Sequence, residues 1–279
     1  DFVRGIAIDG DLAYLAASAG GLKVLDISNR RSPRKLTQLS TEADALDVVV
    51  RDKLVYVATS KGLEVIDASR PTEPRLIGRL EVEDNDFQID LLGNNVLLLG
   101  QDHGLSVIDV TRPEAPRMVG ELRLSVALGI AVVRDHAFII HHRFGPGDAS
   151  VLSAVDLSKP SRPRIVAEIQ THDGPVDVVV KDGLAYVACF YNGLWVADIS
   201  DPARLREVAS LPLPGIYRVA IERGTLVAGL IYAEEMIRTL ALCTIDVSRP
   251  EAPAFLGSAD VDTSVTALAV DDGTAFLGS

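Results

Sequence analysis

Residues 62–74 read Gly-Leu-Glu-Val-Ile-Asp-Ala-Ser-Arg-Pro-Thr-Glu-Pro: a short apolar run, an aspartate and a proline-rich turn. Variants of this phrase recur along the chain, 41 to 48 residues apart, with their aspartates at Asp26, Asp67, Asp109, Asp156, Asp198 and Asp246. Short apolar runs bounded by Gly, Pro and Asp are typical of β-strands. A period of about 40–45 residues made only of such segments is typical of β-propeller blades. We therefore predict an all-β protein, a β-propeller of four-stranded blades, as a single domain over residues 1–279.

The unit around this phrase predicts four strands, at residues 46–50, 54–58, 63–67 and 75–80. The near-continuous apolar runs of the first two strands predict burial of both faces. The mixed composition of the fourth predicts an outermost position. The recurring aspartate is expected to cap the following turn by accepting backbone N–H groups. The prolines then end the third strand, because proline has no N–H to donate to a sheet.

The number of repeats predicts a seventh blade that is incomplete. Pairs of inner strands begin near seven positions, but only six outer pairs follow them; the inner pairs start near Val3, Leu46, Phe87, Leu128, Val176, Tyr217 and Val265. Six full repeats plus a half repeat at 265–279 therefore predict seven blades. We expect the chain to be a fragment, with its last blade completed by flanking sequence or by another chain, since an open blade presents an unpaired edge.

The core Gly-Leu-x-Val-Ile-Asp-x-Ser-x-Pro-x-x-Pro, clearest at residues 62–74 and 104–116, resembles the LVIVD repeat family. The resemblance covers nearly all of the chain. It implies a β-propeller of a kind common in exported and surface-attached proteins of bacteria and archaea. An extracellular, cell-surface or periplasmic location follows from the resemblance, although no signal peptide is visible in these residues. The resemblance brings no catalytic motif that maps onto this chain.

Composition excludes several classes of partner. The net charge of −12 argues against nucleic acid and against an anionic membrane face. It fits a soluble protein, or one that meets a cation or a basic partner. No apolar stretch reaches the roughly 20 residues that span a bilayer, so we expect no membrane insertion. The two cysteines are too few for a disulfide framework.

Departures from the repeat indicate where a partner would bind, because insertions in repeat proteins collect on one face. Residues 141–150 and 232–239 replace short turns between the second and third strands of their units, and residues 190–193 precede the only tryptophan. We expect a loop face rich in aromatic anchors for a protein, glycan or surface partner. The predicted partner-binding residues are Phe190, Tyr191, Trp195, Tyr217 and Tyr232.

A second candidate site is the mouth of the central channel. The position that leads into the innermost strand is polar in four units, as Asp47, Gln88, Asp177 and Arg218. Together these side chains could bind a cation or a polar molecule near the axis. The alternative is simple hydration of the channel rim.

A third candidate is a metal site. His103, His142 and His172, with Asp173, are expected in connections on one face of adjacent units. Neutral imidazoles and a carboxylate are ligands that suit zinc and other transition metals. The alternative is that they are unrelated loop residues, because their spacing matches no known metal motif.

These observations favour a non-catalytic binding or assembly module that needs no cofactor. One alternative is a metal-dependent propeller enzyme, an oxidoreductase or a hydrolase, with a divalent metal on the histidines. Another alternative is a structural piece of a larger assembly, completed by strands from elsewhere. A propeller is a scaffold that hosts many unrelated sites, so the fold alone does not decide between them.

Overall fold

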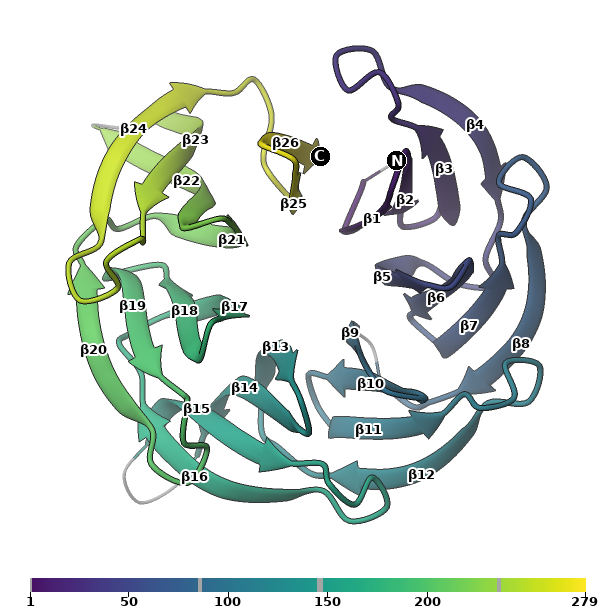
Figure 1. Cartoon of the computed structure of the whole chain (residues 1–279), viewed down its shortest axis with the longest axis horizontal. Helices are drawn as coiled ribbons and strands as arrows, with labels where there is room; N and C mark the ends of the chain where they lie inside the picture. The colour runs from purple at the N-terminus through teal and green to yellow at the C-terminus, as the bar shows by residue number, and fades with distance from the viewer. Residues whose placement is uncertain (1, 85–86, 145–147, 235–236) are drawn as a thin grey trace.

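The computed structural model describes residues 2–84, 87–144, 148–234 and 237–279. Within these residues the chain forms 26 β-strands arranged as a ring of sheets around a central opening (Figure 1). The strands are ordered as antiparallel meanders, so that each sheet is built from consecutive strands. None of the described residues belongs to a helix long and apolar enough to cross a membrane. The prediction of an all-β propeller is confirmed.

The first three blades follow one another along the chain. Blade one contains β1 (Gly5–Asp9), β2 (Leu12–Ala16), β3 (Leu22–Asp26) and β4 (Arg34–Leu39). Blade two contains β5 (Ala45–Arg51), β6 (Leu54–Thr59), β7 (Gly62–Asp67) and β8 (Arg75–Glu81). Blade three contains β9 (Phe87–Leu92), β10 (Asn95–Gly100), β11 (Gly104–Asp109) and β12 (Arg117–Leu122). The four strands predicted in blade two are confirmed to within one residue at each end.

Three more four-stranded blades and a shorter sheet continue the ring. Blade four contains β13 (Ala127–Val133), β14 (His136–Arg143), β15 (Ala149–Asp156) and β16 (Arg164–Gln170). Blade five contains β17 (Pro175–Lys181), β18 (Leu184–Cys189), β19 (Gly193–Asp198) and β20 (Arg206–Leu211). Blade six contains β21 (Ile216–Glu222), β22 (Thr225–Glu234), β23 (Ile237–Asp246) and β24 (Ala254–Asp260). The last sheet contains β25 (Ala267–Asp271) and β26 (Thr274–Gly278).

Six complete blades occur among the described residues, not seven. The seventh sheet has only the two strands β25 and β26, so the described residues contain no complete seventh blade. This short sheet nevertheless lies between blade six and blade one (Figure 1). The backbone N–H of Val265 donates to the hydroxyl of Tyr217 in β21 at 2.8 Å, and the hydroxyl of Thr266 donates to the carbonyl of Val3. In the described residues, seven innermost strands therefore surround the central opening, whereas only six sheets have third and fourth strands outside them.

Local turn chemistry explains the strand ends. The hairpin between β5 and β6 has Asp52 at φ 53° and Lys53 at φ 63°, the left-handed pair that a two-residue type I′ turn requires. At the end of β7 the carboxylate of Asp67 accepts the backbone N–H of Ser69 at 2.8 Å. The same bond to the residue two positions on recurs at Asp26, Asp109, Asp156, Asp198 and Asp246. The recurring aspartate is thus a turn cap, as the sequence predicts.

Burial follows strand position in the blade. The second and third strands of the complete blades are the most buried, as in β6 and β7, whereas the first strand is half-buried, as in β5. The expectation that both faces of the first strand are buried is wrong, because that strand lines the central channel. The outermost position predicted for the fourth strand is confirmed. Apolar clusters lie between neighbouring blades and join the sheets to one another.

The two expanded connections are longer hairpins, not loops. In blade four, β14 continues through Arg143 and pairs with β15, with His141 opposite Val151 and His142 opposite Ser150. In blade six, β22 and β23 pair as far as Glu234 opposite Ile237. The sequence predicts loops at residues 141–150 and 232–239, but strands of eight residues in blade four and of ten residues in blade six continue the ladder into these segments. Parts of both segments, at 145–147 and 235–236, lie outside the described residues.

Candidate functional site at the channel mouth and loop face

One face of the ring holds both the channel mouth and the longer connections. In an antiparallel meander, connections between the second and third strands emerge on the same face as those that lead from one blade to the next. The backbone N–H of Ser60, from the first kind, donates to the carbonyl of Asp44, from the second kind, at 3.0 Å. We call this side the loop face; its connections between second and third strands include residues 17–21, 60–61, 101–103, 144, 148 and 190–192.

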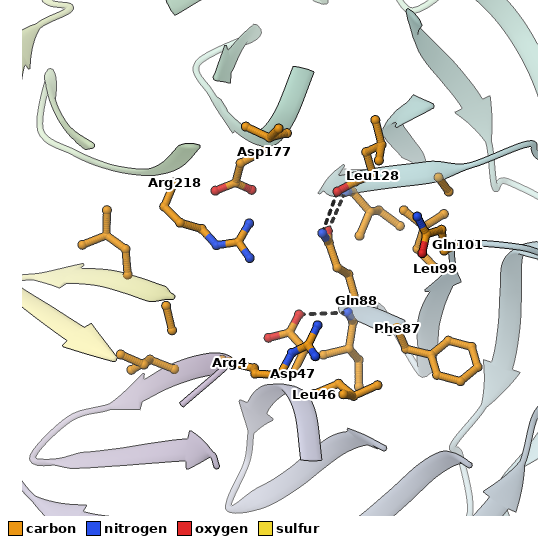
Figure 2. A pocket seen from close by; sticks show the side chains of 18 of the residues that line it. Arg4, Leu46, Asp47, Phe87, Gln88, Leu99, Gln101, Leu128, Asp177 and Arg218 are labelled. Atoms are coloured by element: carbon orange, nitrogen blue, oxygen red, sulfur yellow. Dashed lines mark hydrogen bonds between the residues drawn. The ribbon is translucent and has the colours of Figure 1, made fainter. Parts of the chain in front are cut away.

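The channel mouth is a cavity of about 360 Å³ at the start of the innermost strands. The four polar residues predicted there all line it, together with Arg4 (Figure 2). Figure 2 shows Asp177 and Arg218, from neighbouring strands, with their side chains directed into the opening, and Asp47 and Gln88 on another part of the rim. The prediction that these side chains share one mouth agrees with this placement.

Asp47 joins two blades through its carboxylate. Its Oδ1 accepts the N–H of Val48 in its own strand at 2.9 Å, and its Oδ2 accepts the N–H of Ile89 in blade three at 3.1 Å. Blade one makes room for it with Gly5, where a Cβ atom would lie 2.8 Å from the Cα of Asp47. The side chain is therefore fitted between three consecutive blades.

The remaining polar rim residues make the same kind of bridge. Asp177 in β17 accepts the N–H of Val219 in blade six at 2.9 Å. Gln88 in β9 donates to the carbonyl of Leu128 at 2.7 Å and accepts from the N–H of Ile130, both in β13 of blade four. Arg218 in β21 donates through Nε to the carbonyl of Thr266 at 3.0 Å, beside the last sheet. Each residue thus links the start of one blade to the start of the next.

Removal from water dominates the electrostatics of the two carboxyl groups. Desolvation raises the pKa of Asp47 to about 7, against the opposing effect of the N–H groups of Val48 and Ile89 and the charge of Arg218. Desolvation also raises the pKa of Asp177, with Arg218 as the main opposing charge. In β9 the pKa of Asp90 is raised to about 6 by burial, opposed by the N–H groups of Leu91 and Val132. The rim therefore holds carboxyl groups that exchange protons nearer neutral pH than exposed carboxyls do.

The polar side chains of the rim are already hydrogen-bonded to backbone groups and hold neighbouring blades together. Each of the two aspartates uses both oxygens on backbone N–H groups, and Gln88 uses both ends of its amide. Backbone N–H groups at the edge of a channel would otherwise depend on water. This observation favours a structural role for Asp47, Gln88 and Asp177. Like the alternative of a hydrated rim, such a role needs no bound ligand.

The predicted metal ligands have separate local partners. His103 lies 3.4 Å from the carboxylate of Asp84 through Nδ1, and His142 lies 3.6 Å from Asp148 through Nε2. His172 lies 3.4 Å from Glu207 in β20. Asp173 follows it in the connection to β17. Across the described ranges, no three His, Cys, Asp or Glu side chains form a group that could hold a metal ion. The metal site remains a prediction without a formed cluster in its support.

The predicted aromatic anchors fall into different environments. Trp195 is a core residue and not a surface anchor, because its side chain is 0% exposed in the cluster between blades four and five. Tyr217 is half-buried and bonded to Val265, so it fastens the last sheet to blade six. Phe190 is half-buried beneath the loop face. The side chain of Tyr232 lies outside the described part of the chain. Tyr191 remains, with 70% of its surface exposed.

The structure adds an aromatic residue that the prediction omitted. Phe144, at the end of the extended hairpin of blade four, is 63% exposed and packs edge-on against His142 with ring centroids 4.6 Å apart. Tyr191 packs in the same T-shaped manner against Phe190, at 5.4 Å, and its ring covers Gly174. The sequence signal for Phe144 is its place within the expanded connection at residues 141–150. That signal alone does not distinguish a binding residue from an ordinary loop residue.

The buried cysteines and His141 complete the polar inventory near this face. Cys189 and Cys243 are free thiols, and burial raises their pKa values to about 12 and about 11. His141 is buried, and its Nε2 lies 2.8 Å from the hydroxyl of Ser153. Desolvation lowers the pKa of His141, so its imidazole is neutral near pH 7. These groups are buried within the sheets, away from the exposed surface of the loop face.

Comparison with known proteins identifies the class of repeat. The chain has the fold of a β-propeller, and the model of the LVIVD repeat matches it at residues 2–40, 42–82 and 176–211. The LVIVD repeat that the motifs predict is confirmed in these three segments. No curated protein sequence matches the chain.

Two solved structures share the fold at low sequence identity. The computationally designed Ika8 protein aligns with a TM-score of 0.66 and 13% identity, over 100% of this chain and 93% of its own. Sqt1 of Saccharomyces cerevisiae aligns with a TM-score of 0.70 and 10% identity, over 99% of this chain and 79% of its own. At these identities the similarity concerns the fold alone.

Proposed function

We propose that this protein is a non-catalytic binding module that presents its loop face to a protein partner. The observation that carries the proposal is the pair of exposed aromatic side chains on that face, Phe144 and Tyr191. Large aromatic side chains supply much of the binding energy in protein interfaces, because they bury a large area with few rotatable bonds. The two residues belong to neighbouring blades, four and five, and both lie in connections on the loop face.

Both anchors are held in place before any partner arrives. Tyr191 rests on Gly174 and against the ring of Phe190, and Phe144 rests against His142. Side chains that are already ordered lose less conformational entropy on binding, which leaves more of the interaction energy available for affinity.

We also propose that β25 and β26 are the inner half of a seventh blade. They occupy the place of a seventh unit in the inner ring. Val265 and Thr266, which lead into β25, are hydrogen-bonded to Tyr217 in β21 of blade six and to Val3, just before β1 of blade one. The proposal concerns the architecture that carries the binding face and does not depend on the identity of the partner.

The binding proposal is tested by affinity capture with matched variants. The bait is the chain itself, compared with Phe144→Ser/Tyr191→Ser and with the control Leu76→Ser/Ile165→Ser. The control residues are also exposed apolar side chains, but they lie in the outermost strands β8 and β16. We expect a protein retained by the wild type to be lost by the loop-face variant and kept by the control. Equal retention by all three baits would reject the loop face as the binding surface.

A further inference from the structure

Neighbouring blades fit together through a glycine in the outermost strand. In β8 a Cβ atom on Gly78 would overlap the carbonyl oxygen of Pro113 and lie 3.1 Å from the Cδ of Pro116, both in the proline turn of blade three. In β12 a Cβ atom on Gly120 would meet Pro160 and Pro163 of blade four in the same way. The absence of a side chain at this position therefore lets the proline turn of the following blade sit against the strand.

Blade six has the same glycine without the turn. Gly257 in β24 pairs with Thr244, as Gly78 pairs with Val65 and Gly120 with Val107. A Cβ atom on Gly257 would have no heavy atom of the described residues within 4 Å. The outer strand of blade six is thus shaped to receive a proline turn, and its receiving position is open.

The apolar neighbour of this glycine is open as well. Leu256 is 60% exposed. The residues at its position in the other blades are all half-buried and packed into the clusters shared with the following blade: Leu36, Ile77, Val119, Val166 and Val208. An exposed leucine where the repeat buries an aliphatic side chain indicates an unfilled packing position.

The third strands of blades six and one, which flank the gap in the outer layer of the ring, are also less buried than their counterparts in other blades. In blade six, Leu242 and Thr244 are half-buried, whereas their counterparts Leu63 and Val65 in blade two are buried. In blade one, Leu25 is half-buried, whereas its counterpart Ile66 is fully buried. Both walls of the opening between blade six and blade one therefore carry apolar groups that the repeat normally covers.

A groove of about 700 Å³ occupies this position, lined mainly by apolar surface from blade six and the last sheet. Its lining includes Leu242, Thr244, Gly257, Val270 and Ala275. Within the described residues β26 pairs only with β25, so one edge of β26 is open to a further strand, and Leu277 on it is exposed. An open strand edge beside an apolar groove is a template for strand addition.

We propose that this groove binds one antiparallel strand pair of the repeat's own type, as the outer half of a seventh blade. The first strand of the pair carries the Leu-x-Val-Ile-Asp pattern and adds to the open edge of β26. The Pro-x-x-Pro turn that follows it rests on Gly257, and the second strand forms the outer edge. The occupant is inferred from the packing of Pro113 on Gly78 and of Pro160 on Gly120, and it is separate from the partner of the loop face.

The probe is a labelled peptide that copies Gly62–Glu81, the strand pair β7 and β8 of this chain. We expect the peptide to bind the whole chain saturably and one to one. Fluorescence anisotropy of the label measures this binding. The variant Gly257→Val should weaken binding by roughly tenfold or more, because a side chain there would meet the proline turn. The free variant should fold normally, since the added atoms enter open space. Phe255→Val, on the same strand but outside the groove lining, should leave binding unchanged.

A second arm appends residues 60–81 after Ser279 as part of the same chain. We expect a higher Tm than that of the wild type, and Gly257→Val should remove the gain. A copy with Asp at the positions of Leu63 and Val65 should give no gain. The proposal is overturned if neither the peptide binds nor the appended copy raises Tm, or if Gly257→Val has no effect on either. It is also overturned if sedimentation shows a dimer through β26 that the peptide does not dissociate, since a second copy would then be the occupant.

Discussion

The carboxylate of Asp177 in β17 accepts the backbone N–H of Val219 in β21 at 2.9 Å, across the boundary between blades five and six. Asp47 makes the same bond to Ile89 across the boundary between blades two and three. A polar side chain at the start of an inner strand thus fastens that strand to the next. The ring around the channel is held by these bonds in addition to the apolar clusters between the blades.

Removing one of these fastenings should lower stability. For Asp177→Ala we expect the free energy of unfolding to fall by about 1–3 kcal/mol, because two backbone N–H groups lose their acceptor in a half-buried channel. Asp44→Ala, in an exposed connection on the same face, is the matched control and should change it by less than about 0.5 kcal/mol. Urea unfolding measures both. Equal values for the two variants would mean that the bridging bond contributes nothing.

The raised pKa of Asp47 predicts a pH dependence of stability. The group titrates near 3.8 when unfolded and at about 7 when folded, so the native state binds more protons between these values. Its contribution is present below about pH 4 and is lost as pH rises through about 7. The raised pKa values of Asp90 and Asp177 act in the same direction, and the lowered pKa of His141 opposes them.

The variant Asp47→Asn isolates this effect. We expect the urea midpoint of the wild type to fall between pH 5 and pH 7.5. The midpoint of Asp47→Asn should fall by less over the same range. The turn-cap aspartates titrate below pH 4, since hydrogen bonds lower their pKa values, and so do not contribute in this window. An unchanged pH dependence in the variant would show that Asp47 is ionised throughout the range.

Two glycines at equivalent positions should respond in opposite ways to the same substitution. Gly78→Ala should destabilise the protein by about 1–3 kcal/mol, because the added methyl group would overlap Pro113 in the next blade. Gly257→Ala should leave stability unchanged or raise it by up to about 1 kcal/mol, because its surroundings are open and glycine is unfavourable in strands. Thermal and urea unfolding of both variants check this. Similar losses at the two sites would mean that Gly257 is already covered.

The metal alternative is tested by elemental analysis. We expect the tag-free protein, after incubation with zinc, copper, manganese and calcium and subsequent dialysis, to retain far less than one equivalent of any of them. The reason is that His103, His142 and His172 each face a different carboxylate, Asp84, Asp148 and Glu207. Near-stoichiometric metal that disappears when the three histidines are changed to alanine would contradict this expectation and favour an enzyme.

The repeat made much of the fold predictable. The spacing of the aspartates defined the blades, and the Pro and Asp residues around Asp67 and Pro71 placed the strand ends to within a residue. The burial of the first strand was not predictable in the same way, because its apolar residues face a channel that only the closed ring creates. The extended hairpins at His141 and Tyr232 were also missed, since a longer ladder and a longer loop have similar sequences here.

The candidate site was predictable only in part. The position at the start of each inner strand could be aligned from the sequence, and its four polar members, Asp47, Gln88, Asp177 and Arg218, line one cavity. Their bonds to the following blade depend on ring geometry, which no single repeat contains. Trp195 was placed on the surface because it follows a loop, whereas alternation along β19 directs it into the core between blades. Exposure, which separates Tyr191 and Phe144 from Trp195, is a property of the assembled ring.

Partner binding by the loop face is tested most directly by residue-specific photo-crosslinking. A photoreactive amino acid is placed at Tyr191 in one sample and at Leu76, an exposed residue of the outer strand β8, in another, and both are irradiated in extract of the native source. We expect a discrete protein adduct from position 191 that is absent from position 76 and that disappears when Phe144 is also changed to serine. The same adducts from both positions, or none from position 191, would contradict a binding module that acts through its loop face.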